Sequence, residues 1–168
     1  MDFKDFFIES SLEGLHDSAV QAFPNTTRRQ HVIDPVEVED IVYTPYLGVN
    51  TLYVRADMRN EDRHYRSSIL FKGVNYHEQD GINLINVMRD GRNYFLERLT
   101  LETEVNIRCN CPDFKWRFVH YDHLDRSLYG RNRAPYQNQG GPPANPMEMP
   151  GMCKHLMALT RDLEGVLL

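Results

Sequence analysis

Apolar and polar residues alternate along much of the central chain, which is the pattern of strands with one buried face. The alternation at 36–43 predicts a first strand that Pro45 interrupts. Residues 49–56 and 67–76 are rich in β-branched and aromatic side chains and predict two further strands. The intervening segment 55–66 carries many charges of both signs, so we expect a solvated loop there.

More strands are predicted around the dipeptide Asp90-Gly91. This dipeptide favours the two-residue turn of a β-hairpin, in which both central residues need positive φ. The apolar-rich segments 82–88 and 94–99 flank it and would form the two arms. Segment 101–109 then places apolar residues at every second position and predicts a last strand. The total is about five or six mostly antiparallel strands.

Helical patterns occupy both ends of the chain. Apolar residues within 1–23 recur at helical spacing, which predicts one or two short helices. Ser10 or Ser11 would cap the second part, and Pro24 would stop it. The polar residues 25–34 that follow are expected to form an exposed connector.

The C-terminal segment has the pattern of an amphipathic helix, because apolar residues recur every three or four positions from Met152 to Val166. Mostly antiparallel strands between terminal helices predict the α+β fold class. We expect residues 1–100 to form the sheet portion and residues 101–168 a second portion. A chain of 168 residues can hold both within one compact domain.

The composition is that of an ordinary globular protein, with 41% apolar and 26% charged residues. We expect no membrane span, because no apolar run approaches the length that crosses a bilayer. The first residues lack the basic and apolar regions of a secretory signal, which favours a reducing compartment. The net charge of −5 weighs against a dedicated DNA-binding domain, since phosphate contacts usually require a basic surface.

All three cysteines of the chain lie in two short motifs, CxC at 109–111 and CxH at 153–155. Tetrahedral Zn²⁺ is commonly bound by three thiolates and one imidazole. The expected ligands of one structural Zn²⁺ are therefore Cys109, Cys111, Cys153 and His155. The first pair would lie at the end of a strand and the second pair in the first turn of the C-terminal helix. Free backbone N–H groups there favour thiolate over thiol.

Other interpretations of these residues remain open. A free cysteine is often a small buried hydrophobe, which is the better explanation for any one of the three taken alone. A disulfide would leave one thiol unpaired, and Cys109 and Cys111 could bridge only with strain. His120 or His123, which lie between the two motifs, could also replace His155 or bind a second metal.

The residues between the two motifs predict an ordered arm at 113–152. Its first part, 113–123, contains the only tryptophan and many aromatic residues, enough to pack as a short ordered element. Its second part, 130–151, holds five of the nine prolines and four of the ten glycines, which predicts a loop used for contact. Cations interleave with aromatic residues here, and the expected partner-binding residues are Trp116, Arg117, Tyr129, Arg131, Arg133 and Tyr136.

The order CxC, spacer, CxH resembles the SWIM-type zinc finger. The four expected ligands match that pattern position by position, and the apolar helix after CxH also fits. The 41-residue insert is longer than the usual SWIM spacer. Together with Pro112-Asp113-Phe114 and the run at 150–156, it resembles the long-insert SWIM-like proteins of tailed bacteriophages with large genomes. The resemblance covers 101–168 and implies a virion setting more readily than a mechanism.

The favoured expectation is a zinc-stabilised structural or protein-interaction protein. The resemblance implies a minor capsid, neck or tail component of a tailed phage, made in the host cytoplasm and bound to other structural proteins. The alternative is a nucleic-acid-binding SWIM module. An enzyme is the least supported reading, because zinc with four protein ligands has no open position for water or substrate.

Overall fold

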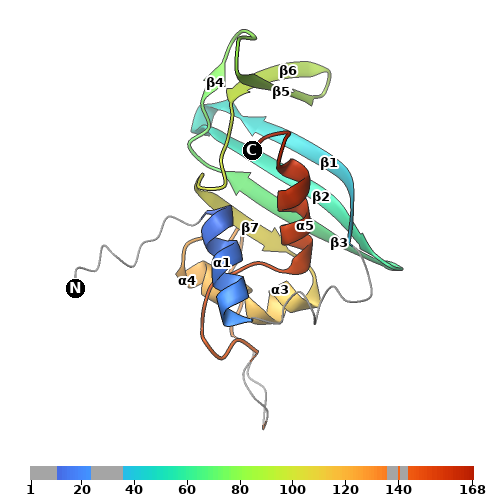
Figure 1. Cartoon of the computed structure of the whole chain (residues 1–168), viewed down its shortest axis with the longest axis vertical. Helices are drawn as coiled ribbons and strands as arrows, with labels where there is room; N and C mark the ends of the chain where they lie inside the picture. The colour runs from blue at the N-terminus through green and yellow to red at the C-terminus, as the bar shows by residue number, and fades with distance from the viewer. Residues whose placement is uncertain (1–10, 24–35, 136–139, 141–143) are drawn as a thin grey trace, which may run out of the picture.

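The computed structural model describes residues 11–23, 36–135, 140 and 144–168. The fold is α+β, with helices packed against antiparallel sheets (Figure 1). The elements in chain order are α1 (Leu12–Ala22), β1 (Glu37–Tyr46), the 3₁₀ turn η2 (Leu47–Val49), β2 (Thr51–Asn60), β3 (Arg63–Phe71), β4 (Tyr76–His77), β5 (Leu84–Arg89), β6 (Arg92–Glu97), β7 (Val105–Cys109), α3 (Pro112–Arg117), α4 (Val119–Leu124) and α5 (Lys154–Leu163).

A four-stranded antiparallel sheet in the order β1-β2-β3-β7 forms the centre of the molecule. Alternate residues of β2 face the core, and Leu52, Val54, Ala56 and Met58 are all fully buried. Helix α5 lies across one face of this sheet and contacts β1, β3 and β7 (Figure 1). This packing brings the start of α5 beside the end of β7.

The charged segment 55–66 is not a loop, as its composition predicts, but the hairpin formed by the end of β2 and the start of β3. Its inward residues Ala56 and Met58 are buried, while the charged residues take the alternate positions of β2. Cross-strand ion pairs stabilise the outer face, including Arg59 Nε to Glu39 Oε1 at 3.1 Å. A strand needs an apolar residue only at every second position, so dense charge does not exclude one.

Pro45 lies inside the first strand and does not interrupt it. β1 continues to Tyr46, and Pro45 stands opposite Leu52 of β2. β1 is an edge strand, so one side of its backbone has no neighbouring strand within the sheet. Proline has no N–H to donate and is tolerated at such an edge. The predicted break at Pro45 is therefore wrong.

The strand predicted at 101–109 begins only at Val105. A turn precedes it, in which the Thr100 N–H donates to Thr103 Oγ1 at 3.0 Å. The Glu102 N–H donates to Thr100 Oγ1 at 3.2 Å. Threonine hydroxyls can satisfy the backbone locally in this way, so the apolar alternation does not lead to strand pairing here.

The hairpin predicted at Asp90-Gly91 is confirmed. Both residues have positive φ, 51° and 76° respectively, as the tight two-residue turn requires. β5 and β6 pair from Leu84 opposite Glu97 to the turn, and β4 adds a short third strand. This second sheet lies at the end of the molecule opposite α3 and α4 (Figure 1).

Helix α1 begins where the sequence predicts a cap. The Ser11 side chain accepts a hydrogen bond from the Gly14 N–H at 3.1 Å. One face of the helix packs into the core, where Ala19 is fully buried. The rest of the predicted N-terminal helical segment and the connector fall in 1–10 and 24–35, outside the described residues.

Candidate metal centre

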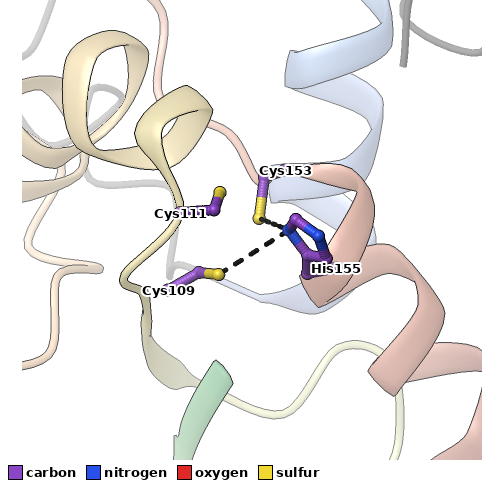
Figure 2. A group of neighbouring side chains, drawn as sticks. All are labelled: Cys109, Cys111, Cys153 and His155. Carbon is purple, nitrogen blue, oxygen red and sulfur yellow. Dashed lines mark hydrogen bonds between the residues drawn. The ribbon is translucent and has the colours of Figure 1, made fainter. Parts of the chain in front are cut away.

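The four expected ligands come together at one point in the structure (Figure 2). They are Cys109, Cys111, Cys153 and His155. Their ligand atoms lie within 4.8 Å of one another, and all four side chains are buried. The three cysteines are free, so none is used in a disulfide. His120 and His123 do not belong to this group, and His155 takes the fourth position.

Three elements deliver these side chains. Cys109 is the last residue of β7. Two residues further on, Cys111 is the N-cap of α3, and Pro112 takes the first helical position, where its missing N–H costs nothing. Cys153 is the N-cap of α5, and His155 lies in the first turn of that helix. The predicted placement is therefore right for His155 and one residue too far into the helix for Cys153.

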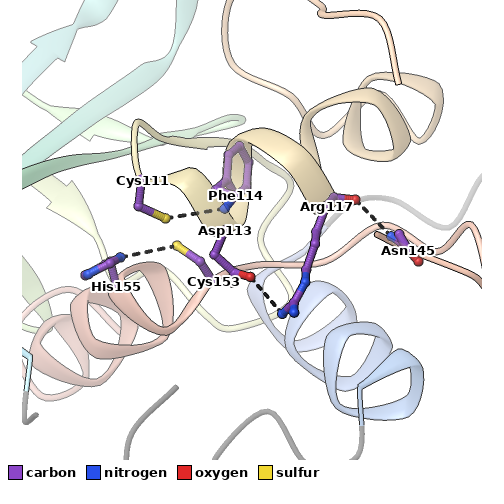
Figure 3. Close-up of polar contacts among 7 residues, drawn as sticks. All are labelled: Cys111, Asp113, Phe114, Arg117, Asn145, Cys153 and His155. Atoms are coloured by element: carbon purple, nitrogen blue, oxygen red, sulfur yellow. Dashed lines mark hydrogen bonds and ion pairs between the residues drawn. The ribbon is translucent and has the colours of Figure 1, made fainter. Parts of the chain in front are cut away.

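Backbone groups favour negative charge on the sulfur atoms. The Phe114 N–H donates to Cys111 Sγ at 3.3 Å (Figure 3). Hydrogen bonds to the charged form and the positive ends of helix dipoles both stabilise thiolate over thiol. The N-cap Cys153 makes no side-chain capping bond to the backbone of α5, which leaves its sulfur available as a metal ligand at the positive end of that helix.

The imidazole of His155 presents Nδ1 to the sulfur atoms. This nitrogen lies 3.9 Å from Cys109 Sγ and 3.9 Å from Cys153 Sγ (Figure 2). The ring of Tyr65 packs against the imidazole, with centroids 4.9 Å apart. Nε2 lies on the side of the ring away from the cysteines (Figure 2), is buried and has no hydrogen-bond partner among the described residues.

Ionisation of all three thiols in this buried space is unfavourable without a cation. Burial raises the pKa of the Cys109 thiol, but hydrogen bonds from Cys111, Cys153 and His155 outweigh this effect and lower that pKa well below its usual value. The hydrogen bond with Cys109 raises the pKa of Cys111, and burial raises the pKa of Cys153 well above its usual value. A divalent cation would supply the charge that stabilises three adjacent thiolates.

A buried carboxyl group holds the end of the insert close to this centre. The Gly151 N–H donates to Asp122 Oδ1 at 2.8 Å. Asp122 in α4 is fully buried, and its Oδ2 has no partner among the described residues. Burial raises the pKa of Asp122 well above its ordinary value, although the Gly151 N–H opposes the shift. No local pattern marked Asp122, because its partner lies 29 residues further along the chain.

Hydrogen bonds of Asn145 and Ser18 also fix residues 145–150, the segment that leads into the CxH motif. Asn145 Nδ2 donates to the carbonyl of Arg117 at 3.0 Å (Figure 3). It also donates to the carbonyl of Met149 at 2.7 Å. The Ser18 hydroxyl in α1 donates to the carbonyl of Pro150 at 2.6 Å. The chain that enters the CxH motif is therefore bound to both α3 and α1 before it reaches Cys153.

Arg117 and Trp116, both expected to bind a partner, lie in different surroundings. The Arg117 side chain is only 17% exposed, pairs with Asp113 at 2.7 Å and covers the Phe23 ring at 4.7 Å. Trp116 is 38% exposed, with the Arg133 guanidinium 4.7 Å from its ring centre. The structure therefore places Trp116 and Arg133 together at the surface and uses Arg117 within the fold.

Tyr129 and Arg131, also expected to bind a partner, make contacts within the fold. Tyr129 stacks on Tyr53 of β2, with ring centroids 5.1 Å apart. Arg131 is exposed, and its carbonyl accepts a hydrogen bond from Arg108 at 2.8 Å. Tyr136 lies outside the described residues. The ordered first half of the insert, folded as α3 and α4, agrees with its aromatic composition.

Comparison with protein-family models, curated proteins and solved structures gives no match for this chain. The centre is therefore interpreted from its own residues. No helix in the described part of the chain is long and apolar enough to span a membrane.

Proposed function

We propose that the protein binds one structural Zn²⁺ through Cys109, Cys111, Cys153 and His155. The observation that carries the proposal is the convergence of three thiols and one imidazole, all buried, within 4.8 Å. Three sulfur ligands and one nitrogen ligand are a common donor set for tetrahedral structural zinc. Softer or borderline metals suit thiolates better than Mg²⁺ or Ca²⁺, which take oxygen ligands.

The proposed metal would connect segments that are distant in the sequence. It would join the end of β7 to the starts of α3 and α5, and so close the insert into a loop. Structural zinc contributes on the order of 10 kcal/mol or more to folding in small zinc domains. Four protein ligands leave no coordination position for water or substrate, so we expect a structural rather than a catalytic role.

We further propose that the protein so stabilised is an interaction component of a larger assembly, with the virion of a tailed phage as its setting. The resemblance of the ligand order and long insert to phage SWIM-like proteins supports this setting. The exposed Trp116 and Arg133 support an interaction role, because Trp and Arg are enriched at protein interfaces. Mass spectrometry of purified particles tests the setting, and absence of the protein from assembled particles would contradict it.

Nucleic-acid binding is the second candidate. Trp116 has Lys115 Nζ 4.9 Å and the Arg133 guanidinium 4.7 Å from its ring centre, and such aromatic and cationic groups can stack on bases and contact phosphates. The net charge of −5 opposes binding to the long, negatively charged phosphate backbone of a nucleic acid. A filter-binding titration over a salt series separates the candidates. Affinity that falls steeply with salt favours nucleic-acid binding. Absence of binding at low salt excludes this second candidate.

The metal is tested by measuring zinc content and the absorption spectrum after Co²⁺ replacement. We expect one metal per chain and the intense visible bands of tetrahedral cobalt with thiolate ligands. His155→Ala should lower metal occupancy and change the cobalt spectrum. His123→Ala is the matched control, since His123 is exposed and outside the ligand group. A pure, folded protein without metal that fails to bind added Zn²⁺ or Co²⁺ would contradict the proposal.

A further inference from the structure

A cavity of about 340 Å³ adjoins the metal centre. The β2–β3 hairpin lines one side of it with Asn60, Arg63 and Tyr65, and the first turn of α5 contributes Lys154 and His155. Helix α3 forms the remaining side, where Asp113 and Arg117 lie near the candidate ligands (Figure 3). This volume is at the small end of ligand-binding pockets and fits a small polar group better than a large apolar ligand.

His155 gives the cavity a buried hydrogen-bond donor. If Nδ1 binds the metal, Nε2 carries the proton of the neutral imidazole and can only donate. A metal-bound histidine usually donates this N–H to a carboxylate, a carbonyl or water. Here the residue is 3% exposed, Nε2 has no partner among the described residues, and His155 is one of the residues that line the cavity. An acceptor bound in the cavity beside His155 would satisfy this N–H.

Asn60 has a second unsatisfied polar atom at the same cavity. Its Oδ1 is buried without a hydrogen-bond partner in the described part of the chain. A half-turn of the side-chain amide exchanges Oδ1 for the Nδ2 group, which has two N–H donors. Asn60 can therefore join His155 in donating to one bound acceptor. Leaving both groups unpaired is unfavourable, because a buried polar group without a hydrogen bond has lost its hydration without compensation.

The charges around the cavity indicate the sign of that acceptor. Among the described residues that line the cavity, Arg63, Arg117 and Lys154 are cations and Asp113 is an anion, which gives two net positive charges. The Asp113 carboxylate is paired with Arg117 at 2.7 Å. Zn²⁺ with three thiolates and a neutral imidazole carries one negative charge. The region as a whole then has one positive charge left over, which matches a monoanion.

A carboxylate fits these conditions better than a nucleic-acid phosphate. Both groups accept from a guanidinium fork and from N–H donors. A nucleic-acid strand, however, would bring further phosphates onto a protein whose net charge is −5. A single carboxylate places only one negative charge in the cavity, where the cations lie.

We propose that this cavity binds a carboxylate, held by the Nε2–H of His155, the amide of Asn60 and the guanidinium of Arg63. The carboxylate would come from an acidic side chain of a partner protein or from a free small acid. The inference rests on the proposed metal, because coordination at Nδ1 makes His155 Nε2 a donor. It gives the proposed interaction protein a specific recognition site.

The test is an NMR titration of ¹⁵N-histidine-labelled, metal-loaded protein, with metal content measured on the same sample. Acetate is added at constant ionic strength against chloride as the reference anion. We expect the His155 Nε2–H resonance to shift with acetate and not with chloride. Arg63→Gln should weaken acetate binding about tenfold, as expected for loss of one charge-assisted hydrogen bond. Arg66→Gln, an exposed arginine three positions along β3, should leave it unchanged.

A second arm compares acetate with an acidic peptide and with dimethyl phosphate. If the peptide binds more tightly than acetate, the carboxylate comes from a partner protein. If the two bind equally per carboxylate, the natural ligand is a free small acid. Tighter binding of dimethyl phosphate overturns the carboxylate assignment. The inference is overturned if the His155 resonance of metal-loaded protein does not shift with acetate, or if the two arginine variants have equal effects. Either result leaves the metal proposal intact. A protein that binds no metal overturns both.

Discussion

Gly151 packs tightly against Ala19 of α1 and Phe118, and is hydrogen-bonded to Asp122 of α4. A Cβ atom at this position would lie 2.6 Å from Phe118 Cε1 and 2.9 Å from Ala19 Cβ. Contacts this short require neighbouring atoms to move, and both neighbours belong to the buried core. The Gly151 N–H meanwhile donates to the buried Asp122. Gly151 is therefore needed for its lack of a side chain, two residues before Cys153 of the candidate metal centre.

Gly151→Ala tests this close packing. We expect the free energy of unfolding to fall by about 1–3 kcal/mol, because an added methyl group in a packed core forces side chains and backbone to shift. Urea unfolding of the metal-loaded protein measures the change. Gly48→Ala is the control, since a Cβ at Gly48 has no atom within 4 Å. Equal stability of the two variants would contradict the packing argument.

Asp122→Asn tests the buried carboxyl group. Because burial raises its pKa in the folded state, the folded protein binds the Asp122 proton more tightly than the unfolded chain does. The contribution of Asp122 to stability is then greatest at low pH. It falls as pH rises above the unfolded value, with a slope of at most about 1.4 kcal/mol per pH unit. An amide has no such dependence.

Stability of Asp122→Asn relative to the natural protein should therefore increase as the pH is raised from about 4 to 7. Urea unfolding at several pH values, at saturating metal, measures this difference, in which the pH dependence of the metal ligands cancels. Asp162→Asn, a change at an exposed position of α5, provides the matched control. A difference that is constant with pH would show that the Asp122 carboxyl titrates normally.

At the scale of elements, the ends of strands and helices do most to build the site. β7 ends at Cys109, while α3 and α5 both begin at a cysteine N-cap. Periodicity predicted the last helix, and the Asp90-Gly91 dipeptide predicted its hairpin, because both signals are local. Two predictions were wrong, the strand break at Pro45 and the loop at 55–66. The first depends on β1 being an edge strand, and the second depends on which face of β2 is buried.

The N-cap of α1 at Ser11 was predicted from the sequence, and its contribution to stability can be measured. Ser11→Ala removes the hydrogen bond to the Gly14 N–H and should lower the free energy of unfolding by about 1 kcal/mol. Ser11→Gly should cost only a few tenths of a kcal/mol, since glycine is tolerated at N-caps. Thermal or urea unfolding of the two variants gives the comparison. Alanine and glycine variants of equal stability would show that the cap contributes little.

At the scale of the whole molecule, the proposed metal should stabilise the end that contains its ligands more than the opposite end. The ligands come from β7, α3 and α5, whereas the β4-β6-β5 sheet lies at the far end of the molecule (Figure 1). The two ends are therefore expected to respond differently when the metal is removed. Sub-global opening of this kind is common in proteins whose parts differ in local stability.

Metal removal by a chelator should raise amide hydrogen exchange in α3, α4 and the first turns of α5. The β5–β6 hairpin should keep its protection, because its turn and strand pairing do not involve the ligands. Exchange measured by mass spectrometry, with and without restored Zn²⁺, resolves these segments. A uniform increase over the whole chain would indicate instead that the metal is required for the global fold.

The sequence by itself identified the four residues of the candidate metal centre, the helix after CxH and the Asp90-Gly91 hairpin. Those features rest on residue chemistry and on short-range periodicity, which act over a few positions. Only the tertiary structure decided that 55–66 is a hairpin, that Asp122 binds Gly151, and that a cationic cavity adjoins His155. These features depend on which distant segments pack together, and a one-dimensional pattern does not contain that information.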